Sequence, residues 1–154
     1  MSDLDEASAA AEGACQVSDV PIFCSMSFTQ VGRTIMGVRP SDAFERLREL
    51  GVTAVGANCG EGVEPVVSGL GEMQSARQSA GGGLAPALIA KPNAGLPHLE
   101  NGNTVFDLGP GEIAAYTKEF LDLGAQIVGA CCGSTPAHIA AIAAQVTDYL
   151  GTAG

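Results

Sequence analysis

Basic residues are scarce in this chain, and their scarcity excludes a large class of partners. Only 7 lysines and arginines stand against 17 aspartates and glutamates, which gives a formal net charge of −10 over 154 residues. Such a charge repels both the phosphates of nucleic acids and the headgroups of anionic lipids. We therefore expect neither a nucleic acid nor a membrane surface as a partner.

Two targeting features are also missing. The sequence has no charged amino-terminal region followed by an apolar stretch, which is the pattern of a secretory signal. No apolar run approaches the roughly 18 residues that a membrane span requires. The 5 cysteines are an odd number without a secretory context, so we expect reduced thiols, with Cys15 and Cys24 as packing residues. These absences predict a soluble, cytoplasmic protein.

What is present is a repeating pattern of apolar runs, loops and helical segments. Hydrophobic residues make up 46% of the chain, enough for one domain with a proper core. Residues 1–16 are acidic and alanine-rich and form either a frayed lead-in or the tail of a helix, so the domain proper is 17–154. Buried strands are predicted at 21–28, 52–56, 87–91 and 126–129. Helices are predicted from Ser41 as N-cap to 50, over 63–80 up to the glycines 81–83, from Pro110 to 123, and from Pro136 to about 150.

This alternation of strand and helix predicts an α/β fold of four consecutive βα units with a parallel sheet. A closed barrel of eight such units takes about 250 residues, so the chain supplies half of a TIM (β/α)8 barrel. An open four-stranded sheet would expose apolar surface and unpaired backbone at its edges. We therefore expect a second copy of the chain, as a homodimer, or a complementary half-barrel chain to complete it.

Three cysteines stand where apolar strands give way to glycine turns, namely Cys59, Cys131 and Cys132. Neighbouring side chains in a strand point to opposite faces, so the adjacent pair must lie at the strand exit to share a ligand. Their Cα atoms are about 3.8 Å apart, below the roughly 4.4 Å at which unstrained disulfides begin. The pattern predicts a zinc site. Buried structural thiols are the alternative, and a redox switch at the adjacent thiols is a weaker one.

The two cysteine segments resemble the zinc motifs of the homocysteine S-methyltransferase family. Residues 54–60 look like its first zinc–cysteine motif, and residues 129–139 look like its second. Weaker matches at 25–34 and 91–97 are closest to members that take methyl from a corrinoid. The resemblance covers about residues 12–148 and implies strands five to eight of the barrel. The first half of that barrel is missing, with the loops that hold the amino-acid end of the substrate.

The resemblance implies a zinc-dependent methyl transfer to homocysteine that gives methionine, with methylcobalamin on a partner corrinoid protein as the donor. Zinc held by three thiolates keeps one position open for a substrate thiol, and coordination removes the proton of that thiol. Asn58, Lys91 and Asn93 are candidate substrate-binding residues, although turn or solvated roles compete with that interpretation. The alternative function is a non-catalytic zinc-binding or assembly subunit, or a truncated remnant.

Three other polar residues receive weaker predictions. His98 lies in a long loop and His138 in the first turn of a helix, so surface or capping roles outweigh metal ligation for both. Glu61 is expected to be a solvated loop acid near the rim of the sheet.

Overall fold

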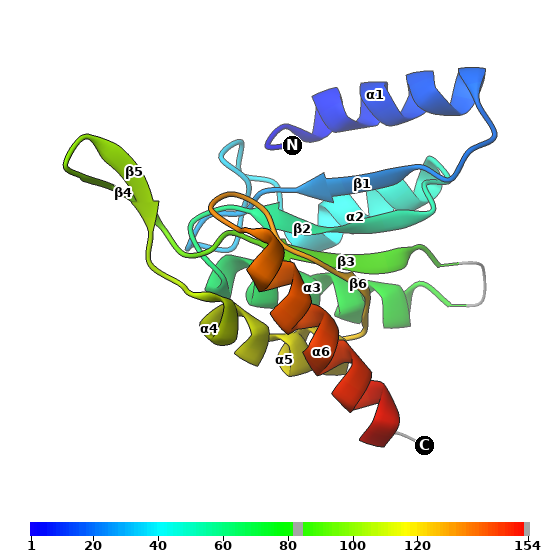
Figure 1. Cartoon of the computed structure of the whole chain (residues 1–154). Coiled ribbons are helices and arrows are strands. Elements are labelled where there is room, and N and C mark those ends of the chain that lie inside the picture. The colour runs from blue at the N-terminus through cyan, green and yellow to red at the C-terminus, as the bar shows by residue number, and fades with distance from the viewer. Residues whose placement is uncertain (82–84, 153–154) are drawn as a thin grey trace.

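The protein is built on one parallel sheet, seen in the computed structural model that describes residues 1–81 and 85–152 (Figure 1). Its strands lie in the order β1-β2-β3-β6, and every neighbouring pair is parallel. The strands are β1 (Phe23–Met26), β2 (Ala54–Cys59), β3 (Ala87–Pro92) and β6 (Ala125–Val128). The predicted α/β architecture with parallel strands is therefore confirmed.

Six helices accompany the sheet in the described part of the chain. They are α1 (Leu4–Val17), α2 (Pro40–Glu49), α3 (Glu64–Ser79), α4 (Pro110–Ala115), α5 (Thr117–Asp122) and α6 (Pro136–Thr152). The acidic amino-terminal segment thus forms helix α1, and the Asp3 side chain caps it by accepting from the backbone N–H groups of Asp5 and Glu6. None of these helices is long and apolar enough to cross a bilayer.

The sequence misplaced several boundaries. Helix α2 begins at Pro40 with Arg39 as its N-cap residue, so the prediction of Ser41 as N-cap was wrong. Proline suits the first helical position because its fixed φ is already helical. The helix predicted from Pro110 to 123 is divided into α4 and α5 at Tyr116. Of the glycines predicted to end α3, Gly82 and Gly83 lie outside the described residues.

The predicted long loop from 92 to 109 contains a second, antiparallel sheet. Its strands are β4 (Pro97–Glu100) and β5 (Asn103–Phe106), which form a hairpin that projects from the body of the molecule (Figure 1). Asn101 and Gly102 form the turn, with positive φ angles of 50° and 81°. An Asn-Gly pair is the typical sequence of such a hairpin turn, so the signal was present in the sequence.

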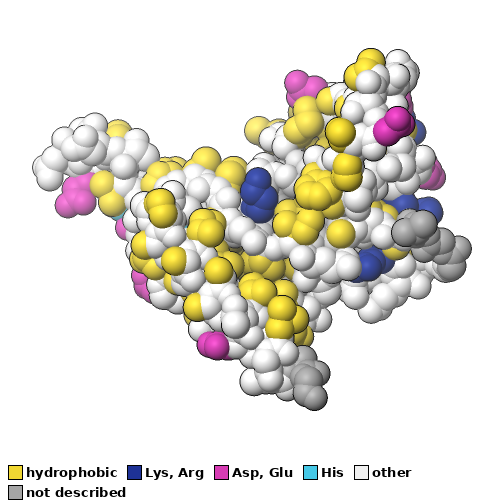
Figure 2. All heavy atoms as spheres, turned by 45° about the vertical axis from the view of Figure 1, so that its right-hand side comes forward, with side chains coloured by type: hydrophobic (Ala, Val, Ile, Leu, Met, Phe, Trp, Pro, Cys, Tyr) yellow, Lys and Arg dark blue, Asp and Glu magenta, His cyan; other side chains and the backbone are white. Residues whose placement is uncertain are grey.

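One face of the sheet forms the core with the helices. Met26, Val55 and Leu88 on the strands are fully buried, as are Phe44 of α2 and Phe120 of α5. The opposite face is open. Phe23 is 57% exposed there, and Figure 2 shows hydrophobic side chains gathered on the molecular surface between α1 and the carboxyl-terminal helix.

The close approach of β2 and β3 requires glycine at position 56. A Cβ atom on Gly56 would lie 2.0 Å from the carbonyl oxygen of Ile89, so a side chain would force the two strands apart. We expect Gly56→Ala to lower the free energy of unfolding by about 3 kcal/mol, measured by urea denaturation. Gly71→Ala is the matched control, because nothing lies within 4 Å of its Cβ position. Equal stability of the two variants would contradict this account of the sheet.

Candidate functional site

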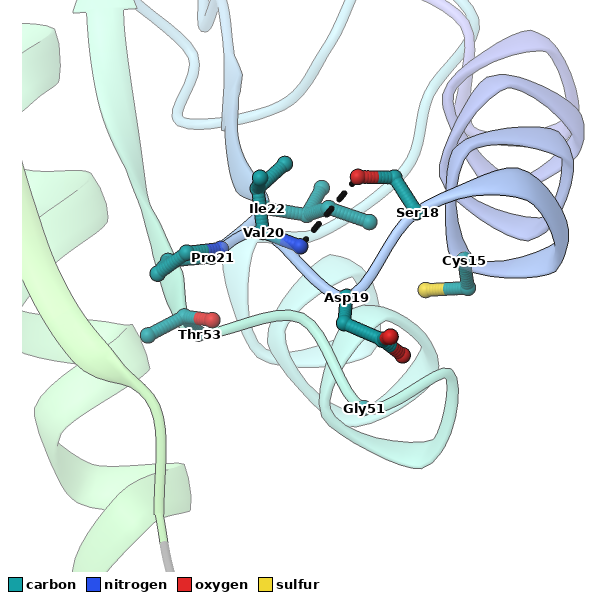
Figure 3. Close-up of a pocket in the computed structure, with 8 residues that line it drawn as sticks. All are labelled: Cys15, Ser18, Asp19, Val20, Pro21, Ile22, Gly51 and Thr53. Atoms are coloured by element: carbon teal, nitrogen blue, oxygen red, sulfur yellow. Dashed lines mark hydrogen bonds between the residues drawn. The ribbon is translucent and has the colours of Figure 1, made fainter.

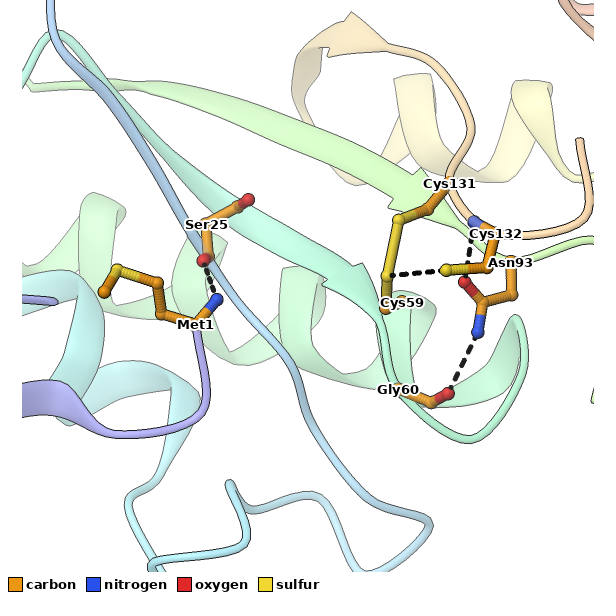
Figure 4. The surroundings of a disulfide bond; sticks show 7 residues. All are labelled: Met1, Ser25, Cys59, Gly60, Asn93, Cys131 and Cys132. Atoms are coloured by element: carbon orange, nitrogen blue, oxygen red, sulfur yellow. Dashed lines mark hydrogen bonds between the residues drawn. A yellow bond between two sulfur atoms is a disulfide. The ribbon is translucent and has the colours of Figure 1, made fainter. Parts of the chain in front are cut away.

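The structure brings the three predicted cysteines together at the carboxyl ends of β2 and β6 (Figure 4). Their sulfur atoms all lie within 4.8 Å of one another. Cys59 and Cys131 form a disulfide with a Cα–Cα distance of 5.7 Å. The Sγ atom of Cys132 lies 3.8 Å from that of Cys59. Two segments separated by more than seventy residues thus meet at a single point.

Main-chain hydrogen bonds place the adjacent cysteines beyond the end of β6. The backbone N–H of Cys131 donates to the carbonyl of Pro92 (2.8 Å), and that of Ala94 donates to the carbonyl of Cys132 (2.9 Å). Strand-like pairing with the β3 segment therefore continues past Val128. This main-chain pairing holds the double-cysteine turn against the segment that follows β3.

Two tight turns aim the sulfur atoms. Cys59 has a φ of 52°, a left-handed conformation that is rare for residues other than glycine and is typical of strained functional sites. The following Gly60 has a φ of 74°, and a Cβ atom there would lie 2.3 Å from the carbonyl oxygen of Phe28. At the other turn, a Cβ atom on Gly133 would lie 2.2 Å from the ring of Phe106. Both glycines are therefore required by their surroundings.

Asn93 joins the two cysteine loops. Its Nδ2 donates to the carbonyl of Gly60 (3.2 Å), and its Oδ1 accepts from the backbone N–H of Cys132 (3.1 Å), as Figure 4 shows. The side chain is only 6% exposed. The sequence suggested a substrate contact for Asn93 but gave no sign of this bridge, which depends on the tertiary fold.

Removing this bridge should weaken metal binding without unfolding the chain. We expect Asn93→Ala to reduce the zinc affinity of the reduced protein by about 10- to 100-fold, because residues that orient metal ligands have effects of this size. The measurement is competition against a chromophoric chelator. Asn103→Ala, in the exposed hairpin, is the control. Identical affinities for the two variants would show that the bridge does not position the sulfur atoms.

Asn58 and Lys91 are neighbours across β2 and β3, where they are paired in register. The Oδ1 atom of Asn58 is buried and has no hydrogen-bond partner in the described residues. Lys91 is exposed and lines a hollow of about 330 Å³ on the open face of the sheet. The candidate substrate-binding residues therefore lie beside the cysteine cluster, with an unused acceptor and a cation among them.

One pair of sulfur atoms in the cluster has the spacing of two ligands of a tetrahedral metal ion. Two sulfur atoms at about 2.3 Å from zinc and at tetrahedral angles are about 3.8 Å apart, and the Sγ atoms of Cys59 and Cys132 have this separation, 3.8 Å. Three thiolates are also a donor set that zinc favours. The cluster can therefore hold a metal ion.

The disulfide corrects the expectation of five reduced thiols. Cys59 and Cys131 are paired because the two strand ends bring their sulfur atoms into bonding range. The predicted weaker alternative, a bond between Cys131 and Cys132, is not formed, and Cys132 is a free thiol. Metal ligation requires thiolates, so the disulfide and the metal compete for the same two sulfur atoms.

The remaining cysteines lie apart from the cluster. Cys24 is buried in the core, and this burial raises the pKa of its thiol. Cys15 is exposed at the end of α1, beside a pocket lined by Ser18, Asp19 and Thr53 among others (Figure 3). Neither belongs to the group of residues placed to hold a metal ion.

His138 caps helix α6. Its Nδ1 accepts from the backbone N–H of Thr135 (3.1 Å), so its Nε2 carries the proton and donates to the carbonyl of Leu108 (3.0 Å). His98, in contrast, is a surface residue of the hairpin, 3.4 Å from Asp107.

Glu61 connects two loops at the rim of the sheet. Its carboxylate accepts from the backbone N–H of Gln30 (2.8 Å), and the Gln30 side chain donates to the Glu61 carbonyl (2.6 Å).

The Ser134 hydroxyl, which the sequence did not single out as a candidate, is buried without a partner in the described residues.

Comparison with known proteins identifies the family. A sequence profile described as homocysteine S-methyltransferase matches residues 1–146. The chain belongs to the homocysteine S-methyltransferase family. This family member is 31% identical over 130 residues to "Methionine synthase" of Mycobacterium tuberculosis. The aligned region covers 84% of this chain and 10% of that relative. Against "Methionine synthase" of Mycobacterium leprae the identity is 30% over 128 residues, with 82% and 10% covered.

Solved structures share the fold of this homocysteine S-methyltransferase family member. The apo form of the homocysteine methyltransferase MmuM from Escherichia coli superposes with a TM-score of 0.70 at 23% identity, covering 94% of this chain and 46% of that one. Its metallated form gives a TM-score of 0.68 at 24% identity, with 94% and 42% covered. The chain therefore spans less than half of these solved relatives and a tenth of the two methionine synthases.

Proposed function

We propose that this homocysteine S-methyltransferase family member is a zinc-dependent methyltransferase, or a subunit of one, that presents homocysteine as a thiolate for methylation to methionine. The observation that carries the proposal is the convergence of Cys59, Cys131 and Cys132 at one point on the rim of the sheet. Family membership supports methyl transfer as the reaction class. The non-catalytic alternative is not favoured, because the relatives are named as enzymes.

The three cysteines would hold the metal as thiolates. Zinc, when bound, lowers the pKa of a coordinated thiol, so that homocysteine is deprotonated at neutral pH. Three thiolates outweigh the charge of the ion, which leaves the site anionic and the substrate sulfur rich in electrons. Asn93 would keep the two cysteine loops together while the substrate enters.

Substrate contacts would come from residues near the carboxyl ends of β2 and β3. The unpartnered Oδ1 of Asn58 is an acceptor for the amino group of homocysteine. The ammonium group of Lys91 is the cation for its carboxylate, and it also balances the charge of the thiolates. Both residues lie next to Cys59 and its partner position Pro92 in the strand register.

The methyl donor in this proposal is methylcobalamin on a separate corrinoid protein or domain. Its support is the resemblance of residues 25–34 and 91–97 to family members that use a corrinoid. We also propose that the four strands correspond to strands five to eight of a (β/α)8 barrel and that the protein acts in the cytoplasm. The remaining substrate contacts then come from outside this chain.

Zinc and thiol binding by the reduced chain test the proposal. Elemental analysis should give one zinc per chain, and calorimetry in two buffers should show homocysteine binding with release of about one proton at neutral pH, because a free thiol with a pKa of about 8.5 is mostly protonated there. Methionine is the control, because its sulfur carries no proton. A reduced chain that binds no zinc, or that binds both compounds alike, would refute the proposal.

A further inference from the structure

One aromatic side chain of the hairpin packs against the turn that carries the two adjacent cysteines. Phe106 is the last residue of β5, and its ring lies against the backbone of Gly133, the residue that follows Cys132. A Cβ atom on Gly133 would overlap three carbon atoms of this ring, so no side chain fits between them. The hairpin therefore contacts the chain one residue away from a predicted metal ligand.

The ring is held in place because the segment that carries it is anchored. Two residues after Phe106, the backbone N–H of Leu108 donates to the carbonyl of Ala94 (3.1 Å), and the Leu108 carbonyl accepts from Nε2 of His138 (3.0 Å). Phe106 also packs against a small buried apolar cluster, which consists of Ala94, Ile113, Ala114 and Ile142. The base of the hairpin is thus attached to the segment after β3, to α4 and to α6.

The same anchor reaches the double-cysteine turn a second time. The backbone N–H of Ala94 donates to the carbonyl of Cys132 (2.9 Å), and Oδ1 of Asn93 accepts from the N–H of Cys132 (3.1 Å). Gly133, the next residue, has a φ of 78°, and glycine is the residue with the widest choice of backbone conformations. The hydrogen bonds restrain Cys132, and the ring of Phe106 restrains the flexible residue that follows it.

We propose that Phe106 is a positioning residue for the metal site. Its ring restricts the backbone at Gly133 and thereby holds the Sγ atom of Cys132, an exposed free thiol, beside the sulfur atoms of Cys59 and Cys131. The hairpin then braces the site from outside the parallel sheet. This inference rests on the proposed function for the identity of the site as a zinc centre, whereas the support of the turn by Phe106 is independent of it.

Zinc affinity of the reduced chain distinguishes positioning from simple filling of the apolar cluster. Phe106→Ala should lower the affinity about 10-fold, because residues that orient metal ligands have effects of at least this size. Phe106→Tyr, which keeps the ring, should retain the wild-type affinity. Leu99→Ala is the control, because Leu99 lies in the same hairpin and is 77% exposed. The measurement is competition against a chromophoric chelator, and an affinity that Phe106→Ala leaves unchanged would overturn the inference.

A double-mutant cycle tests the contact itself. In the wild-type background Gly133→Ala places a methyl group where the ring lies, and in the Phe106→Ala background that space is open. The loss of zinc affinity caused by Gly133→Ala should therefore be at least about threefold smaller in the second background, because residues in contact are energetically coupled. Equal losses in both backgrounds would show that the glycine is needed only for its φ angle, and would contradict the role of the ring.

Hydrogen exchange of the reduced, metal-free chain gives a measurement that does not involve zinc. Phe106→Ala should accelerate exchange at the N–H groups of Ala94 and Cys132, whereas Ala57 in the central strand β2 should keep its wild-type rate. Unchanged rates at Ala94 and Cys132 would overturn the inference. If circular dichroism shows that Phe106→Ala is unfolded, Phe106→Leu replaces it in all three tests, since it keeps an apolar side chain but removes the flat ring.

The two proposals can fail separately. A wild-type chain that shows the exchange effect but binds no zinc would defeat the proposed function and leave the support of the turn by Phe106 in place. Zinc binding by the wild-type chain that is unaffected by Phe106→Ala would defeat this inference alone.

Discussion

Serine in place of Cys59, Cys131 or Cys132 is expected to weaken zinc binding by the reduced chain by more than about 100-fold. The physical reason is that each substitution replaces a thiolate with a hydroxyl group, which is not deprotonated at neutral pH and is a poor zinc ligand. Zinc would then have two sulfur donors in place of three. The measurement is competition against a chelator of known affinity, with the reductant held constant.

The other two cysteines supply matched controls for this prediction. Cys24 is buried, and its thiol pKa is raised by that burial, whereas Cys15 is exposed at the opposite end of the strands. Cys15→Ser and Cys24→Ser should therefore keep the wild-type zinc stoichiometry. Equal losses in all five variants would indicate that binding reflects nonspecific thiol chemistry and not a site.

The second large effect concerns methyl transfer. The chain alone should methylate homocysteine from methylcobalamin at least about 100-fold more slowly than its complex with the complementary half-barrel. Under the proposed function, the chain alone holds the amino-acid end of homocysteine by Asn58 and Lys91 without the contacts of a complementary half, and imperfect positioning of a substrate costs factors of this size. Initial rates of methionine formation provide the measurement.

The complex of the chain with the complementary half-barrel, carrying a substitution at Cys59, controls for activity from other sources. The complex that carries Cys59→Ser should lose the gain in rate while keeping its mass by light scattering. If the isolated chain were as fast as the complex, the complementary half-barrel would contribute no substrate contacts, and this prediction would be wrong.

The sequence was most informative where metal-ligating side chains stand at the ends of predicted strands. Cys59 and the Cys131–Cys132 pair each stand near the end of an apolar run and just before a glycine, Gly60 or Gly133. Parallel strands deliver such positions to one edge of the sheet. The convergence was therefore predictable from local patterns and from the parallel topology. The spacing of the four βα units likewise predicted the parallel sheet that the structure shows.

Features that depend on tertiary contacts were not predictable in the same way. The bridge made by Asn93 exists because β3 lies between β2 and β6, and no local pattern encodes the distance from its amide to Gly60 and Cys132. A surface or capping role was predicted for His138; it caps its helix through Thr135 and is buried, and its bond to Leu108 was not predicted.

Two omissions had different physical causes. The hairpin was missed although Asn101 and Gly102 are its turn signal, because its exposed strands lack the apolar runs by which the other strands were found. The disulfide was missed because the sequence argument considered only the adjacent pair. Convergence on one point brings Cys59 into bonding range of Cys131 as readily as it builds a metal site.

X-ray absorption at the zinc K-edge, recorded on the reduced, zinc-loaded chain, tests the central claim most directly. The account predicts a first shell with three sulfur atoms at about 2.3 Å, reduced to two in the Cys132→Ser variant. A shell made only of nitrogen and oxygen, or a sulfur count unaffected by this substitution, would contradict it.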